Sequence, residues 1–267
     1  MINEEKKYLF IRIPKTASST LRIALGEQNF SNFGIDNIRI GFSSDPISIV
    51  EKPVDQENFK VKSKYIDFLN FTSAATSNVH ARYIEWNEAV DNLENYFTFS
   101  FVRNPWDWMV SQYIFLKKIY KRRLMKESQG KPAVKCFFAS KREDFIKKLE
   151  LFGLGFSDFR ANPDSLSFDR YVESYFSEDA LNKTQLGFLK NKNGEININY
   201  IGKFENLQQD WDELSAEISL NPIDLEPTNV SEGRRKYSDY YSSEITKNTV
   251  TRGLAEDIEY FGYEFGA

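Results

Sequence analysis

The chain has 267 residues, of which 41% are hydrophobic and 15% aromatic, a composition typical of a globular protein and not of a disordered one. A formal net charge of −4 argues against a general nucleic-acid binder. The single cysteine, Cys136, excludes an intramolecular disulfide. With one histidine the sequence offers no Cys/His cluster, so we expect no metal site.

A chain of this length can bury a substantial core, and we expect one domain, 1–267, with insertions. No stretch reads as a secretion signal or a membrane span, because the first apolar run covers only residues 8–13 and leads straight into a turn. The sequence therefore predicts a cytoplasmic protein without integral membrane association.

The first predicted strand is residues 8–13 (YLFIRI), which stops at a proline. Lys15 and a block of small and hydroxyl residues at 16–20 follow, and then a segment of helical pattern. This order brings backbone N–H groups, a helix N-terminus and an ammonium group to one point, which suits a phosphate or sulfate group. The order is that of a P-loop, but the glycines of that motif are missing. The alternative is an ordinary strand-to-helix turn in which Ser18 or Ser19 caps the helix.

After an irregular stretch through residue 77, the pattern predicts a helix over 81–93, and His80 lies just ahead of it. His80 is the only histidine. An imidazole has a pKa near neutrality, so it can accept a proton from a hydroxyl group without further perturbation. A lone histidine is also commonly structural, and that alternative stays open.

Residues 97–102 alternate aromatic and small side chains and predict a second strand, which runs directly into Arg103. Asn104 fits a helix N-cap, Pro105 the first helical position, and Asp107 the acid of a capping box. Arg103 would then lie at the carboxyl end of a strand, where open α/β sheets bind their ligands.

A guanidinium at 103 and the hydroxyl of Ser111, two turns into the predicted helix, could together hold a second phosphate. The alternative is that Arg103 pairs with an acidic side chain and Ser111 is a serine of the helix surface.

Residues 117–148 hold twelve basic residues against three acidic ones. Such a run is usually a solvated helix face, but it could also attract an anionic acceptor such as an acidic glycan. Further elements follow in chain order. We expect helices over 169–176 and 181–189, a strand over 196–201, a helix over 207–220 and a closing helix over 250–261. Between the last two helices, residues 229–237 combine a glycine with three cations, which favours either a basic loop over an anion or a solvated turn.

Residues 13–19 (IPKTASS) and 101–113 (FVRNPWDWMVSQY) together resemble the nucleotide-binding elements of sulfotransferases that use 3′-phosphoadenosine 5′-phosphosulfate (PAPS). The likeness is greatest to carbohydrate sulfotransferases of the heparan sulfate 2-O-sulfotransferase kind and their bacterial relatives. It resumes weakly at residues 200–207 and at the C-terminal helix. Trp108 stands where many members carry an arginine, so a contact made by that arginine is not expected here.

The resemblance implies an α/β protein with a three-layer P-loop NTPase-like fold, in which helices flank a central parallel sheet. The regions near 30–79 and 117–165 would be insertions that bind the acceptor. The implied catalytic residues are His80, as the base, and Lys15. The implied cofactor-binding residues are Lys15, Thr16, Ala17, Ser18, Ser19, Thr20, Arg103, Ser111, Arg235 and Lys236.

The implied reaction moves a sulfuryl group from PAPS to a hydroxyl of an acceptor, most readily a glycan, and releases the bisphosphate PAP without a metal. Two alternatives remain at this point. One is a P-loop nucleotide kinase or hydrolase, which would need a magnesium site. The other is a non-enzymatic binder of phosphorylated or sulfated ligands.

Overall fold

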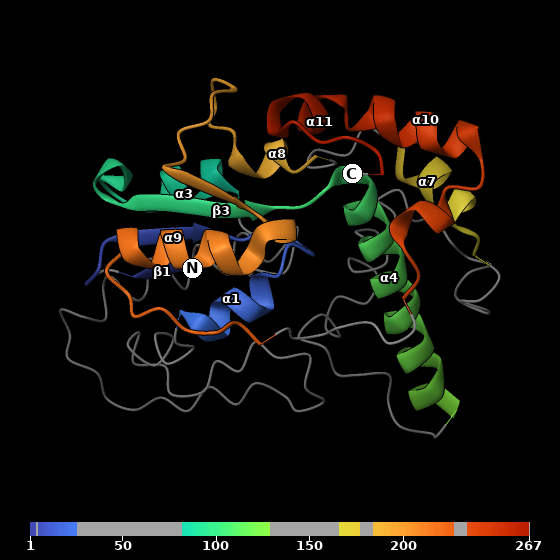
Figure 1. Ribbon diagram of the computed structural model, residues 1–267, viewed down its shortest axis with the longest axis horizontal. Coiled ribbons are helices and arrows are strands. Elements are labelled where there is room, and N and C mark those ends of the chain that lie inside the picture. Colours follow the sequence, from blue (N-terminus) through green and yellow to red (C-terminus); the bar gives the residue numbers. More distant parts are fainter. Residues whose placement is uncertain (4, 26–81, 129–165, 177–183, 227–233, 267) are drawn as a thin grey trace. The chain divides into compact units, whose positions relative to one another are not determined.

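The computed structural model describes the chain outside residues 4, 26–81, 129–165, 177–183, 227–233 and 267 (Figure 1). The described residues divide into two compact units. Apart from residue 4, unit 1 holds residues 1–25, 82–104 and 184–226, and unit 2 holds residues 105–128, 166–176 and 234–266. The single domain expected from the sequence stays a prediction. Most of the two expected insertions lies outside the described residues.

Unit 1 is built on a four-stranded sheet with the strand order β1-β2-β3-β4. The strands are β1 (Ile2–Asn3), β2 (Tyr8–Ile11), β3 (Phe97–Val102) and β4 (Tyr200–Lys203). β2, β3 and β4 run parallel to one another, but β1 pairs antiparallel with β2. The expected all-parallel sheet is therefore a mixed one, because a short turn joins β1 to β2 and a chain that returns through a short turn can pair only in the antiparallel sense.

The strands confirm most of the pattern in the sequence. β3 begins and ends at the predicted residues, and β2 stops two residues before the predicted end at 13. The third strand begins at Tyr200 instead of 196, because Ile196 forms an isolated antiparallel bridge with Lys190 before the chain joins the sheet.

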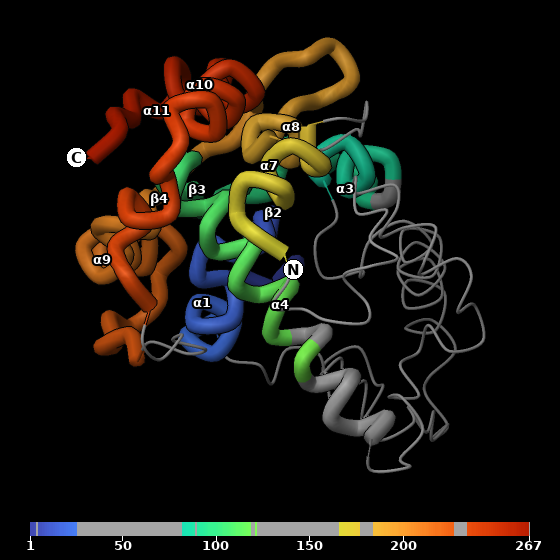
Figure 2. The backbone as a smooth tube through the Cα atoms, turned by 90° about the vertical axis from the view of Figure 1, so that its right-hand side faces the viewer, coloured from blue at the N-terminus to red at the C-terminus, as the bar shows by residue number. Residues whose placement is uncertain are grey.

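Helices lie on both faces of this sheet, with α1 and α9 on one face and α3 and α8 on the other (Figures 1 and 2). Their bounds are α1 (Ser18–Ala24), α3 (Tyr83–Ala89), α8 (Leu186–Leu189) and α9 (Leu207–Glu217), with 3-10 turns at Leu93–Asn95 and Phe204–Asn206. Helix, sheet and helix thus form three layers within unit 1. This matches the layering of a P-loop-like fold, although the fold family itself stays a prediction.

An aromatic core joins α1 and α9 to the sheet of unit 1. Phe10 and Phe99 face each other across β2 and β3, and their rings stack with centroids 4.9 Å apart. Leu21 of α1 and Trp211 of α9 are fully buried in the same cluster. Each such side chain contributes about 1.5–3 kcal/mol by leaving water. This burial holds α1 and α9 against β2 and β3.

Unit 2 is helical, and its elements are α4 (Pro105–Ser128), α7 (Phe168–Phe176), a 3-10 turn at Tyr237–Tyr240, α10 (Glu244–Gly253) and α11 (Ala255–Phe261). The helix starts at Pro105 as predicted. The single closing helix predicted for 250–261 is two helices, because Leu254 leaves the helical conformation with φ −118° and ψ 23°. The Ser243 hydroxyl caps α10 by accepting from the Thr246 N–H.

Aromatic side chains fill the interior of unit 2. The Tyr113 ring meets Phe168 at 5.4 Å, and its hydroxyl donates to the Leu166 carbonyl at 2.8 Å. Three more tyrosines are buried in the same interior, namely Tyr171, Tyr175 and Tyr241. Burial raises the pKa of all three phenols above the ordinary value of 10.0, because a phenolate there would lose its hydration. Across the described residues, no helix combines the length and the apolar character that a membrane span requires.

Candidate active site

The turn between β2 and α1 is held in an unusual backbone conformation. Lys15 and Ala17 adopt φ values of 67° and 61°, in the left-handed region where a side chain costs about 1–2 kcal/mol. Between them the Thr16 hydroxyl, which is buried, donates to the Ile13 carbonyl at 3.0 Å and closes the turn. Backbone strain of this kind persists where the surrounding structure requires it, commonly at functional sites.

The predicted anion-binding residues of this turn alternate in exposure. Thr16, Ser18 and Thr20 are buried, whereas Lys15, Ala17 and Ser19 are partly exposed. The helix begins at Ser18, and its N-cap is Ala17 with no side-chain cap hydrogen bond. The alternative in which Ser18 or Ser19 caps the helix is therefore wrong, because the left-handed Ala17 already turns the chain into the helix one residue earlier.

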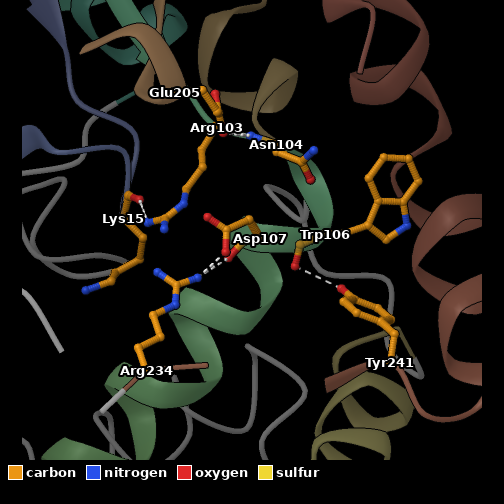
Figure 3. Close-up of polar contacts among 8 residues, drawn as sticks. All are labelled: Lys15, Arg103, Asn104, Trp106, Asp107, Glu205, Arg234 and Tyr241. Carbon is orange, nitrogen blue, oxygen red and sulfur yellow. Dashed lines mark hydrogen bonds and ion pairs between the residues drawn. The ribbon is translucent and has the colours of Figure 1, made fainter. Parts of the chain in front are cut away.

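Arg103 brings the two predicted anion-binding turns together in unit 1. It follows β3 directly, is only 5% exposed, and its Nη1 donates to the Lys15 carbonyl at 3.1 Å (Figure 3). Its guanidinium carbon lies 3.9 Å from the centroid of the Phe204 ring. Because β2 and β3 are parallel neighbours, their carboxyl ends reach the same edge of the sheet, where α/β proteins bind ligands.

Three residues at this edge were missed by sequence reasoning, and two of them support Arg103 directly. Gln185 is fully buried and bonds both main-chain polar groups of Arg103, and Phe204 stacks on its guanidinium. Glu205 Oε1 accepts from the Asn104 N–H at 2.7 Å. Phe204 and Glu205 lie in the segment 200–207, whose weak family likeness was a usable signal, whereas nothing in the sequence marks Gln185.

In unit 2, the first turn of α4 is tied to the segment that follows residue 233. The Asp107 carboxylate forms an ion pair with Arg234, and the Tyr241 hydroxyl donates to the Trp106 carbonyl at 2.9 Å (Figure 3). Asp107 thus has a different partner from the one a capping box predicts. The sequence pointed to Arg235 and Lys236 in this segment and passed over Arg234.

Other predicted residues of unit 2 lie along or opposite α4. Ser111 is 8% exposed, and Trp108 is 1% exposed and among the largest fully buried side chains. The position where many relatives carry arginine is therefore part of the interior of unit 2. Arg235 and Lys236 are exposed, and the Arg235 guanidinium lies 4.8 Å from the Tyr240 ring centroid.

His80 lies outside the described residues, so its role as a base stays a prediction. Tyr83, three residues later, is the first residue of α3 and is buried. Burial, and secondarily the Glu94 carboxylate, raise the pKa of the Tyr83 phenol above 10.0. The Tyr83 phenol therefore stays protonated near neutral pH.

A basic pocket of about 530 Å³ lies wholly within unit 2. The residues that line this basic pocket are Tyr113, Ile114, Lys117, Lys118, Lys121, Arg235 and Tyr240. Lys117 Nζ lies 5.4 Å from the Tyr113 ring centroid. Four cations and two phenol rings thus share one pocket in a chain whose net charge is −4.

The family can be read from comparison with known proteins. The model of the sulfotransferase family matches residues 1–264. This chain belongs to the sulfotransferase family. Comparison with curated proteins and comparison with solved structures gave no significant match. Membership makes this protein a transferase of sulfuryl groups and agrees with the resemblance seen in the two turns; the carbohydrate subtype is not part of that finding.

The described part of this sulfotransferase offers no group of three or more His, Cys, Asp or Glu side chains that could hold a metal ion. Lys15 and Arg103 lie in the turns that follow neighbouring parallel strands of unit 1. Ammonium and guanidinium groups both bind anionic oxygens.

Proposed function

We propose that this sulfotransferase moves a sulfuryl group from PAPS to a hydroxyl group of a carbohydrate. The observation that carries the proposal is the contact between the Arg103 guanidinium and the Lys15 carbonyl. It joins the turn that the family uses for the 5′-phosphosulfate to the residue that the family uses for the 3′-phosphate. An adenosine with anionic groups at both its 5′ and its 3′ position needs two anion-binding groups a short distance apart.

The residues of unit 1 fit the two ends of this nucleotide. In the turn at 15–20, the side chains at positions 16–20 are all small, which lets an anion approach the backbone N–H groups. The Arg103 guanidinium carbon lies 3.9 Å from the Phe204 ring centroid, and a guanidinium carries its N–H donors in one plane, which suits bidentate recognition of phosphate. Ser111, Arg235 and Lys236 belong to unit 2, and we propose them as further ligands on the resemblance alone.

Bound PAPS supplies a sulfuryl group whose sulfur accepts the hydroxyl oxygen of the acceptor while its bond to the bridging oxygen of PAP breaks. His80 takes the proton of the acceptor hydroxyl as the new sulfur–oxygen bond forms. We assign to the Lys15 ammonium the neutralisation of the charge that grows on the bridging oxygen. Arg103 holds the 3′-phosphate and so separates PAPS from nucleotides that lack it.

The basic pocket supports an acceptor that carries negative charge. Lys and Arg side chains bind carboxylate and sulfate groups, and the phenol rings of Tyr113 and Tyr240 give a sugar ring apolar surface to pack against. Neutralising Lys117 together with Lys121 should therefore weaken the binding of an anionic acceptor more than that of a neutral one.

The test is transfer from radiolabelled PAPS to matched sets of neutral and acidic oligosaccharides, with and without EDTA. Transfer should persist in EDTA and be lost in Lys15→Ala and His80→Ala, whereas Arg103→Ala should chiefly weaken PAP binding in calorimetry. Lys192→Ala, an exposed neutralisation elsewhere on unit 1, is the matched control and should behave like the wild type.

Two outcomes would reject the proposal. Phosphate transfer from ATP that EDTA abolishes would favour a nucleotide kinase or hydrolase. Tight PAP binding with no transfer to any acceptor of the set would favour a non-enzymatic binder of phosphorylated or sulfated ligands.

A further inference from the structure

Gln185 is a buried polar side chain whose oxygen and nitrogen atoms both form hydrogen bonds with the main chain of Arg103. The Arg103 N–H donates to Gln185 Oε1 at 2.8 Å, and Gln185 Nε2 donates to the Arg103 carbonyl at 2.7 Å. Gln185 is 0% exposed and immediately precedes α8. A side-chain amide that pairs with both main-chain groups of one residue reproduces the two hydrogen bonds of a β-ladder partner.

We call these two hydrogen bonds between Gln185 and the Arg103 main chain the clamp. The clamp lies just beyond the last hydrogen-bonded residues of the sheet. The β3 ladder ends with Val102 opposite Lys203, and Arg103 is the next residue. Arg103 is itself buried, so its main-chain N–H and carbonyl need partners within the protein. Gln185 supplies both, and this fixes the position of the Arg103 backbone beyond the last strand residue.

The position of the backbone decides where the guanidinium lies. The Arg103 side chain reaches the Phe204 ring at 3.9 Å and the Lys15 carbonyl at 3.1 Å, and both contacts need the Cα to stay in place. The Glu205 carboxylate accepts a hydrogen bond from the N–H of Asn104, the residue after Arg103. Arg103 is therefore held through its own main chain, through its ring partner and through its neighbour.

We propose that Gln185 is a positioning residue of the nucleotide site: it holds the Arg103 backbone so that the guanidinium meets the 3′-phosphate of the donor. This inference rests on the proposed function, because it needs Arg103 to bind that phosphate. Its consequence is specific. Loss of the clamp should lower the affinity for nucleotides that carry a 3′-phosphate and leave the affinity for nucleotides without one unchanged.

The experiment measures the affinities of PAP and of adenosine 5′-monophosphate for the full chain by calorimetry, with Gln185→Met as the principal variant. Methionine keeps the size of glutamine and removes both hydrogen bonds. We expect PAP affinity to fall about tenfold, the effect of about 1.4 kcal/mol, while the affinity for the monophosphate stays within about twofold. In the Arg103→Ala background the same substitution should have no further effect on PAP, because the two residues act through one contact.

Two further variants separate positioning from a general loss of structure. Leu189→Val shortens a buried side chain of α8, the helix that Gln185 precedes. It should lower thermal stability without changing the ratio of the two affinities. Gln185→Leu also removes both hydrogen bonds, so it should give the same loss of PAP affinity as Gln185→Met, and it serves if Gln185→Met does not fold.

The outcomes distinguish this inference from the proposed function. An equal loss for both nucleotides in the Gln185 variants, or an unchanged PAP affinity where Arg103→Ala weakens PAP, overturns the positioning role and leaves the proposed function standing. A PAP affinity that Arg103→Ala does not change overturns both.

Discussion

Replacing Gly202 by alanine tests how the sheet supports the edge that carries Arg103. Gly202 lies in β4 opposite Phe101 of β3, and the Phe101 ring covers it. A Cβ at residue 202 would stand 2.7 Å from Phe101 Cδ1 and 2.8 Å from Cζ, closer than the 3.0 Å limit that real Cβ atoms respect. Phe101 is fully buried in the core of unit 1, so its ring cannot turn aside without displacing its neighbours.

The expected cost follows from two opposing effects. Overpacking a core typically costs about 1–3 kcal/mol. Alanine also lowers the entropy of the unfolded chain, which favours folding by about 0.4–1 kcal/mol. We expect a net loss of about 1–2 kcal/mol in the free energy of unfolding. Because Phe204 follows Gly202 by two residues, a displaced β4 also moves the ring on Arg103, and PAP affinity should fall as well.

Urea unfolding of the purified variant gives the free energy, and calorimetry gives the PAP affinity. The matched control is the same substitution in the Phe101→Leu background, where the shorter side chain leaves room for the new methyl group. There Gly202→Ala should cost less than about 0.5 kcal/mol relative to Phe101→Leu alone. An equal loss in both backgrounds, or no loss in the wild type, would show that the ring is not what requires glycine here.

Three further predictions concern unit 2. Gly253→Ala would place a Cβ 2.7 Å from Phe176 Cζ and should lower the free energy of unfolding by about 1–3 kcal/mol. An unchanged free energy in urea unfolding would contradict this. Above pH 10 the free energy of unfolding should fall by up to about 1.4 kcal/mol per pH unit for each of Tyr171, Tyr175 and Tyr241, because the unfolded chain releases phenolic protons that the folded chain keeps. A flat profile in alkaline denaturation curves would contradict this. Asp107→Asn removes the ion pair with Arg234, whose side chains are 16% and 23% exposed, and should cost about 1 kcal/mol in urea, a loss that must shrink when Arg234 is also changed to methionine.

The turn after β2 reaches a left-handed backbone conformation without the glycines of a P-loop. Lys15 and Ala17 adopt the left-handed conformation that glycine would adopt freely. The Thr16 hydroxyl and the Arg103 guanidinium each bond a carbonyl of the same segment, at Ile13 and Lys15. These contacts offset the backbone strain, so the turn depends on the residue that follows β3 as well as on its own sequence.

Much of the local structure could be predicted because it depends on short-range patterns. Alternating and continuous apolar residues marked β2 and β3, a proline at the first helical position marked the start of α4, and two short motifs marked the family. Such patterns record backbone preference and the burial of one face, both of which act over a few residues. The antiparallel β1 and the break at Leu254 were missed, because a two-residue strand and a single non-helical residue leave almost no periodic signal.

By itself the sequence determined β2, β3, the turns that follow them and the side-chain chemistry that these turns carry. Only the tertiary structure decided which of these groups meet. Arg103 contacts Lys15 across 88 residues of chain and Gln185 across 82, and no local pattern encodes a partner at that separation. The pairing arises because parallel strands bring their carboxyl ends to one edge, where a buried main chain must find hydrogen-bond partners wherever the fold supplies them.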